Sequence, residues 1–108
     1  MNNIVQLRSN IIEACNRCIE DCYACAKSCQ KMLGMESCVK LCGRCIDACK
    51  DCISAFESNS QDRGLYLQAC VDACRACAEE CSKHQHEDCQ NCAASCYNCI
   101  EECEDMML

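Results

Sequence analysis

The sequence predicts an all-α protein, an antiparallel four-helix bundle with a cysteine-lined core. Cysteine occupies 19 of the 108 positions and recurs in four segments in which every gap is three or four residues. That spacing places side chains on one stripe of a helix. An aliphatic residue follows each cysteine at heptad position d, which widens the stripe into the apolar face of a bundle helix. The chain has no proline, so long stretches are free to be helical.

The first two predicted helices carry five cysteines each. The first contains Cys15, Cys18, Cys22, Cys25 and Cys29, and the second contains Cys38, Cys42, Cys45, Cys49 and Cys52. Gly34 suits the position just after a helix C-terminus, because glycine readily adopts the left-handed conformation found there. The first helix is therefore expected to end at Leu33, with a very short connection into the second.

The last two predicted helices follow a longer loop. The third contains Cys70, Cys74, Cys77 and Cys81, and the fourth contains Cys89, Cys92, Cys96, Cys99 and Cys103. The polar run at residues 57–62 is the loop, and Ser58 with Gln61 predicts a capping box for the third helix. Glu87 and Asp88 favour the start of the fourth helix, because negative charge complements the dipole there.

Short connections imply antiparallel neighbours, so the cysteines can be aligned in layers of four. The predicted layers are Cys29, Cys38, Cys81 and Cys89; Cys25, Cys42, Cys77 and Cys92; Cys22, Cys45, Cys74 and Cys96; Cys18, Cys49, Cys70 and Cys99; and Cys15, Cys52, Leu67 and Cys103. Leu67 fills the one place without sulfur, which accounts for the odd number of cysteines. Counted from the end with the two short connections, the gaps between cysteines begin with three residues in the fourth helix and with four in the others. The cysteines of the fourth helix are therefore expected to be slightly displaced from their layers.

Length and charge narrow the class of protein. A chain of 108 residues is expected to form one domain over residues 1–108. The net charge of −7 and the lack of a basic stripe argue against nucleic acid and anionic membranes as partners. The N-terminus lacks the features of an export signal, and no apolar run could span a bilayer, so a cytoplasmic location is expected.

Cysteines of a cytoplasmic protein are kept reduced, and a pattern of them indicates metal binding or catalysis rather than disulfides. Packing alone does not explain them. Exchanging core leucines for cysteines loses roughly 1–2 kcal/mol per site in apolar burial and packing. Over 19 sites the loss exceeds the total stability of a typical domain, about 5–15 kcal/mol. The thiols are therefore predicted to hold metal.

Soft thiolates select zinc, iron–sulfur clusters or Cu(I). The spacing typical of iron–sulfur ferredoxins is absent. Zinc remains open because paired CxxC units are common zinc ligands. Each Zn(Cys)4 site carries a net charge of −2, however, and the predicted core contains no lysine or arginine to neutralise it. Cu(I) at about one ion per thiolate keeps the core near neutral, so multinuclear Cu(I)–thiolate clusters are favoured.

The two ends of the predicted bundle differ. Ile11, Phe56 and Leu67, with Met106, form an apolar plug at one end. Met32, Met35 and His84 lie at the other, and thioether and imidazole groups are Cu(I)-compatible ligands. Our hypothesis is that metal enters at the second end. The alternative is that the methionines cap the core and the histidine lies in a solvated loop.

The alternating CxxC and CxxxC pattern, from about Ile11 to Cys103, resembles the bacterial cytosolic copper storage proteins. The resemblance implies a homo-oligomer, a tetramer, of four-helix bundles that hold many Cu(I) ions on reduced cysteines. It implies storage and detoxification of copper without catalysis. Two alternatives stay open: a zinc-binding thiolate protein, and a thiol redox enzyme, which needs a low-pKa cysteine.

Overall fold

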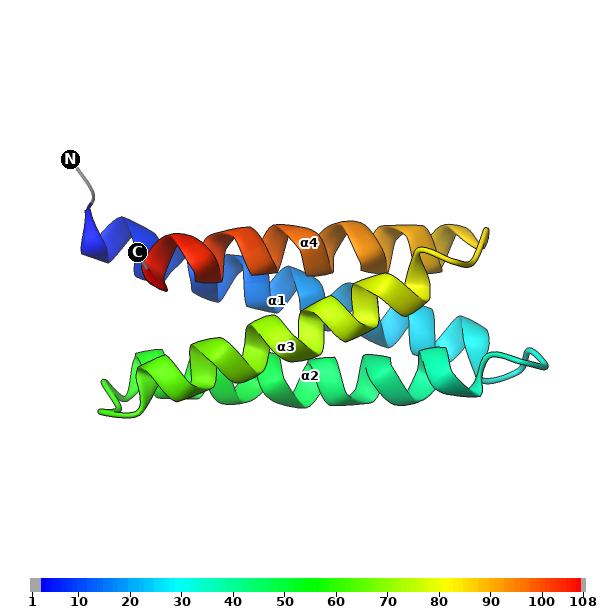
Figure 1. Cartoon of the computed structure of the whole chain (residues 1–108), viewed down its shortest axis with the longest axis horizontal. Coiled ribbons are helices and arrows are strands. Elements are labelled where there is room, and N and C mark those ends of the chain that lie inside the picture. The colour runs from blue at the N-terminus through cyan, green and yellow to red at the C-terminus, as the bar shows by residue number, and fades with distance from the viewer. Residues whose placement is uncertain (1–2, 108) are drawn as a thin grey trace.

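Four α-helices make up the chain in its computed structural model, which describes residues 3–107 (Figure 1). They are α1 (Ile4–Cys29), α2 (Glu36–Glu57), α3 (Arg63–Cys81) and α4 (Glu87–Met107). Helix α1 packs against α2 and α4, and α3 packs against the same two helices. The bundle is elongated, with extents of 45 × 23 × 17 Å. The predicted all-α fold is confirmed, and the described residues contain no strand.

Both ends of the bundle can be followed in Figure 1. The α1–α2 and α3–α4 connections lie together at one end, and the α2–α3 connection lies at the other with the beginning of α1 and the end of α4. We call the first the open end and the second the plugged end. At the plugged end Ile11, Phe56 and Leu67 are buried, and the partly buried Met106 packs against the core cluster to which they belong. The predicted apolar plug is therefore present.

Cysteine side chains fill the space between the helices. All 19 are buried, and each contributes to one continuous core cluster. Within residues 3–107, Ser95 is the one buried side chain that is polar or charged. An apolar core free of charge is what the heptad pattern predicts, because a buried charge without a partner is strongly unfavourable.

The predicted layers are correct for three helices and wrong for α1. Cysteines of α2, α3 and α4 meet as expected, for example Cys45 and Cys74 at 3.6 Å between sulfur atoms. Helix α1 is displaced towards the open end, so Cys15 groups with Cys49, Cys70 and Cys99 instead of with Cys52, Leu67 and Cys103, and its sulfur lies 3.7 Å from that of Cys99. The next inward residue of α1 is Ile11, which is fully buried. Leu67 therefore shares the plugged end with a second residue that lacks sulfur.

Two predicted helix ends are also wrong. Helix α1 ends at Cys29, and a turn at residues 30–35 contains Gly34 with a φ of 81°. Gly34 adopts its left-handed conformation within this turn and not directly after the helix. A glycine in the sequence indicates either position equally well. Helix α3 is preceded by Asp62, whose backbone N–H donates to Ser60 Oγ at 3.1 Å, so the capping box of Ser58 and Gln61 does not form. The predicted start of α4 at Glu87 is correct.

Arg8 joins the beginning of α1 to the end of α2. Its Nη2 donates a hydrogen bond of 2.6 Å to the carbonyl oxygen of Phe56 in the last turn of α2, which also accepts a longer bond of 3.4 Å from the backbone N–H of Asn59. We expect Arg8→Ala to lower the free energy of unfolding by about 1–2 kcal/mol. Arg17→Ala is the matched control, because Arg17 forms an ion pair with the exposed Glu13, and such a pair contributes about 0.5 kcal/mol or less. Urea unfolding of the reduced protein checks both, and equal losses would contradict the assignment.

Candidate metal centre

A continuous network of sulfur atoms runs along the axis of the bundle. Seventeen of the 19 cysteines take part in hydrogen-bonded sulfur contacts of 4.0 Å or less, and the shortest separations are 3.4 Å. Contacts between layers connect the network lengthwise, such as Cys18 to Cys22 and Cys70 to Cys74, both at 4.0 Å. The core is therefore a column of thiols rather than a set of separate pairs.

Groups of four sulfur atoms recur along this column. Three that draw one cysteine from each helix, with sulfur atoms within 4.8 Å of one another, are Cys15, Cys49, Cys70 and Cys99; Cys18, Cys45, Cys74 and Cys96; and Cys22, Cys42, Cys77 and Cys92. Another contains Cys22, Cys45, Cys77 and Cys96, and each of these four cysteines also belongs to one of the groups above. Shared members are what bridging thiolates require, because one sulfur must then face two ions.

The separations suit a soft metal ion. With a metal–thiolate bond of about 2.3 Å, the length known for zinc, three sulfur atoms around a planar ion lie about 4.0 Å apart and four around a tetrahedral ion about 3.8 Å apart. The observed sulfur separations of 3.4–4.0 Å lie at or just below these values. Metal ions can thus enter the column with small outward movements of the side chains.

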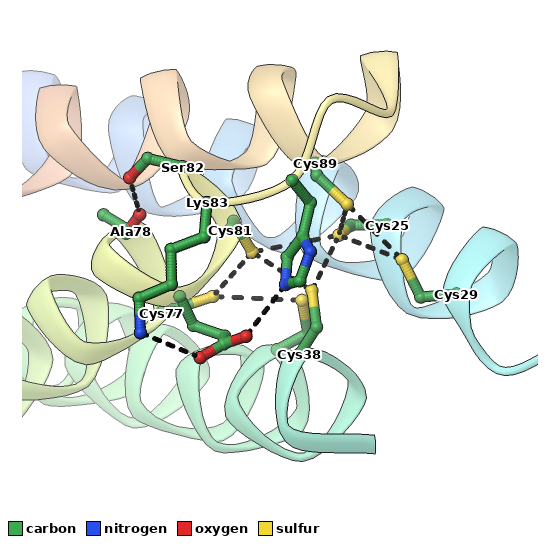
Figure 2. Close-up of polar contacts among 12 residues, drawn as sticks. Cys25, Cys29, Cys38, Cys77, Ala78, Cys81, Ser82, Lys83 and Cys89 are labelled. Atoms are coloured by element: carbon green, nitrogen blue, oxygen red, sulfur yellow. Dashed lines mark hydrogen bonds and ion pairs between the residues drawn. The ribbon is translucent and has the colours of Figure 1, made fainter. Parts of the chain in front are cut away.

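Five sulfur atoms gather at the open end. Figure 2 shows Cys25, Cys38, Cys81 and Cys89 facing one another between the helices, with Cys29 beside them at the end of α1. The sulfur of Cys25 lies 3.6 Å from those of Cys38 and Cys89, and that of Cys29 lies 3.4 Å from that of Cys89. Because α1 is displaced, Cys29 lies beyond the last layer that contains a cysteine from every helix, towards the open end.

Burial keeps two thiols of this end, Cys38 and Cys89, protonated in the metal-free protein. Cys38 lies in the first turn of α2 and Cys89 in the first turn of α4, where a helix dipole favours a thiolate. Desolvation nevertheless raises the pKa of both thiols well above the ordinary 9.0, and the adjacent sulfur atoms of Cys81 and Cys29 raise it further. Neither of these two buried cysteines is the low-pKa, accessible thiol that a thiol redox enzyme needs.

The raised pKa values predict that the metal-free protein loses stability at alkaline pH. Thiols of the unfolded chain ionise near pH 9, while Cys38 and Cys89 stay protonated in the folded state. The folded state therefore binds more protons, and the free energy of unfolding falls as pH rises above about 9, by about 1.4 kcal/mol per pH unit for each such thiol. Anaerobic thermal unfolding at pH 7, 8, 9 and 10 measures this, and a constant midpoint would contradict it.

The three further side chains proposed at the open end occupy different settings. Met35 is buried, whereas Met32 is 41% exposed. His84 lies in the α3–α4 connection, partly buried, with Nε2 2.8 Å from Glu80 Oε2. The hydrogen bond from His84 lowers the pKa of Glu80. His84 therefore contacts the carboxylate of Glu80, and within residues 3–107 it forms no hydrogen bond with a cysteine sulfur.

Sequence reasoning missed two hydrogen bonds that fix α1 against α4. Ser95 donates to the carboxylate of Asp21, and Ser28 donates to the carboxylate of Asp88. Each serine immediately precedes a core cysteine, a position at which a side chain borders the neighbouring helix. This position is the sequence feature from which a contact between helices could have been predicted. Both pairs hold the register in which Cys29 meets Cys89, so they position the sulfur column.

A four-helix bundle whose uncharged core is a column of reduced thiols defines a class of protein: a helix-bundle protein built to take up soft metal ions. The sequence model of the copper storage protein family matches residues 5–108. The chain belongs to the copper storage protein family.

Solved structures agree with this assignment. The chain is similar to the apo form of copper storage protein 3 from Bacillus subtilis, with 34% identity and a TM-score of 0.87 over 93% of this chain and 98% of that one. It is similar to the Cu(I)-bound copper storage protein BsCsp3, with 32% identity and a TM-score of 0.88 over 94% and 99%. The uncharacterized cysteine-rich protein YhjQ of Bacillus subtilis (strain 168) is 35% identical over 59 residues, so this chain spans about half, 55%, of that curated relative.

Proposed function

We propose that this protein stores Cu(I) in multinuclear thiolate clusters inside the bundle, sequestering the ion and holding a reserve of it in the cytoplasm without catalysing a reaction. The observation that carries the proposal is the continuous sulfur column in a core free of buried charge. One Cu(I) per thiolate replaces each thiol proton with one positive charge, so a filled core stays near neutral. A similar bundle is described as Cu(I)-bound, which supports the same cargo here.

The proposed ligands are all 19 cysteines of the core. All of these cysteines are buried in the core. Because several of them belong to two four-sulfur groups, bridged ions are favoured over isolated sites. Cys52 and Cys103 lie at the plugged end, where the buried Leu67 and Ile11 supply no sulfur. Cu(I) accepts two or three thiolates, so two-coordinate binding suits this end.

Zinc is the second candidate cargo, because groups of four cysteines also match a tetrahedral site. Charge separates the two metals. Several Zn(Cys)4 sites in one column place several net charges of −2 in a core with no buried cation among residues 3–107. Competition tests the choice: the reduced protein is equilibrated anaerobically with equal free Cu(I) and Zn(II), desalted and assayed for both metals. Copper should occupy the column almost alone, whereas retained zinc at about one ion per four thiols would overturn the copper proposal.

Self-association is part of the proposal. We propose a homo-oligomer, a tetramer by resemblance to the family, without nucleic acid or membrane partners. Within residues 3–107, no helix has both the length and the apolar character needed to cross a membrane. Exposed apolar side chains are available for contact between copies, including Ile4, Val5 and Tyr97. Sedimentation equilibrium of the reduced protein tests this, since a monomer at tens of micromolar chain would refute it.

Copper is proposed to enter and leave through the open end, where Met32, Met35 and His84 lie. The plugged end is closed by Ile11 and Phe56, which are almost fully buried. Thioether and imidazole groups bind Cu(I), and His84 and Met32 both keep part of their surface in solvent. Anaerobic stopped-flow loading of the His84→Ala variant tests the histidine: a slower uptake supports its role, and an unchanged rate removes it.

A further inference from the structure

A cavity of about 290 Å³ opens to solvent beside the last cysteine of α1. It is lined by Cys29, Gln30, Met32, Glu36, Val39 and Lys40, and we call it the exchange pocket. It lies between the end of α1 and the first turns of α2, at the open end. Its volume falls just below the range of about 300–1,000 Å³ that is typical of small-molecule sites. The exchange pocket therefore suits a ligand no larger than a short peptide.

One wall of the exchange pocket is continuous with the sulfur column. Cys29 retains 1% of its surface in solvent, whereas every other cysteine retains 0%. Its sulfur lies 3.4 Å from that of Cys89 and 4.0 Å from that of Cys25, and it stands beyond the last full layer. An ion held by Cys29 and Cys89 is thus the one nearest to an incoming ligand. Met32 adds a half-exposed thioether, a further soft ligand.

The other wall carries one charge of each sign. Glu36 and Lys40 are both exposed, lie one helical turn apart on α2, and make no ion pair within 4.0 Å with any residue in the described range 3–107. A carboxylate and an ammonium group on one ligand can therefore pair with Lys40 and Glu36 at the same time. Val39 supplies apolar surface between them.

We propose that the exchange pocket binds a small thiol that carries both a carboxylate and an ammonium group, and that this thiol exchanges Cu(I) with Cys29. The inference rests on the proposed storage of Cu(I). In the exchange, the thiol gives its proton to the Cys29 sulfur, the bond between copper and Cys29 breaks, and a bond between copper and the incoming sulfur forms. No electron is transferred, and copper remains Cu(I). The same steps in reverse load the column.

Release kinetics of the fully loaded, intact protein test the exchange pocket. Copper is transferred anaerobically to an excess of chromophoric chelator in the presence of one of four thiols at matched thiolate concentration. The thiols are L-cysteine, which has both charges, cysteamine, 3-mercaptopropionate and uncharged 2-mercaptoethanol. With L-cysteine the rate should saturate as its concentration rises. Lys40→Gln and Glu36→Gln should each raise the half-saturating concentration about three- to fivefold, the size expected for one exposed ion pair.

A same-end control separates this from a general charge effect. Lys83→Gln removes a positive charge from the α3–α4 connection, where Lys83 contacts only Glu80, and should leave the kinetics unchanged. Equal rates for the four thiols, a rate that never saturates, or wild-type kinetics in Lys40→Gln would each overturn the proposal. The ions loaded per chain, counted before release, test storage separately. Full loading with unaltered release overturns only the exchange pocket, and a wild-type chain that holds few ions overturns both.

Discussion

Loading the reduced protein with Cu(I) is expected to raise its thermal unfolding midpoint by about 20 °C or more. Ions that bind the folded column and not the unfolded chain stabilise by mass action, by about 4 kcal/mol per site when free metal exceeds the dissociation constant a thousandfold. Two such sites add about 8 kcal/mol, and each kcal/mol moves the midpoint of a domain of this size by about 4 °C or more. The four-sulfur groups span all four helices, so each filled group ties the bundle together.

Differential scanning calorimetry of the metal-free and loaded forms, both anaerobic, measures this shift. Stripping the loaded sample with a strong Cu(I) chelator is the control, and it should restore the original midpoint if the thiols have stayed reduced. Equal midpoints for the two forms would mean that copper binds outside the column or equally well to the unfolded chain, and would contradict binding in the core.

Replacing two cysteines in the middle of the column should remove more copper than replacing two at the plugged end. The sulfur of Cys18 lies 3.6 Å from those of Cys45 and Cys96, and that of Cys45 also lies 3.6 Å from that of Cys74. Bridging thiolates here would each contact more than one ion. Cys18→Ala with Cys45→Ala is therefore expected to lose about three to four ions per chain.

The matched variant, Cys52→Ala with Cys103→Ala, removes two thiols at the plugged end, where the buried Leu67 and Ile11 supply no sulfur. It should lose about two ions or fewer. Both variants create small cavities, and we expect the metal-free forms to lose roughly 1–2 kcal/mol in unfolding free energy. Metal analysis of the loaded proteins after desalting measures capacity, and urea unfolding measures stability. Equal losses of copper from the two pairs would indicate independent sites instead of bridged clusters.

Much of the fold could be predicted because one residue type marks the core. The spacing of Cys70 and Cys74, or of Cys96 and Cys99, fixes both the helix and its inner face. The aliphatic residues beside them, such as Val71, are buried as the heptad pattern requires. Sulfur at nearly every inner position also predicts the chemistry, since no loop has to be placed to bring the ligands together.

The register of α1 could not be predicted for the same reason. Sliding a helix by one cysteine leaves sulfur in almost every layer, so periodicity does not distinguish the alternatives. The choice depends on the six-residue turn at 30–35, on the paired Ser95 and Asp21, and on Ile11 filling the place that a cysteine was expected to share. Turn geometry and hydrogen bonds across a helix seam are tertiary features, and only the structure shows them.

The open end shows the functional consequence of that register. Displacement of α1 places Cys29 beyond the last layer and beside Met32, while His84 is hydrogen-bonded to Glu80. The sequence predicts that these residues lie at one end of the bundle, but it does not show which of them lies closest to the accessible sulfur atoms. In the structure, the most accessible part of the sulfur column lies on the α1–α2 side of the bundle.

The central claim is that the column holds copper at nearly one ion per cysteine. An anaerobic titration of the fully reduced protein with Cu(I), in competition with a chromophoric chelator, counts the ions bound per chain. Our account predicts that binding continues to a stoichiometry approaching the 19 cysteines. Saturation at about four or five ions, one for every four thiolates, would contradict it and would identify isolated four-sulfur sites in place of a copper-filled core.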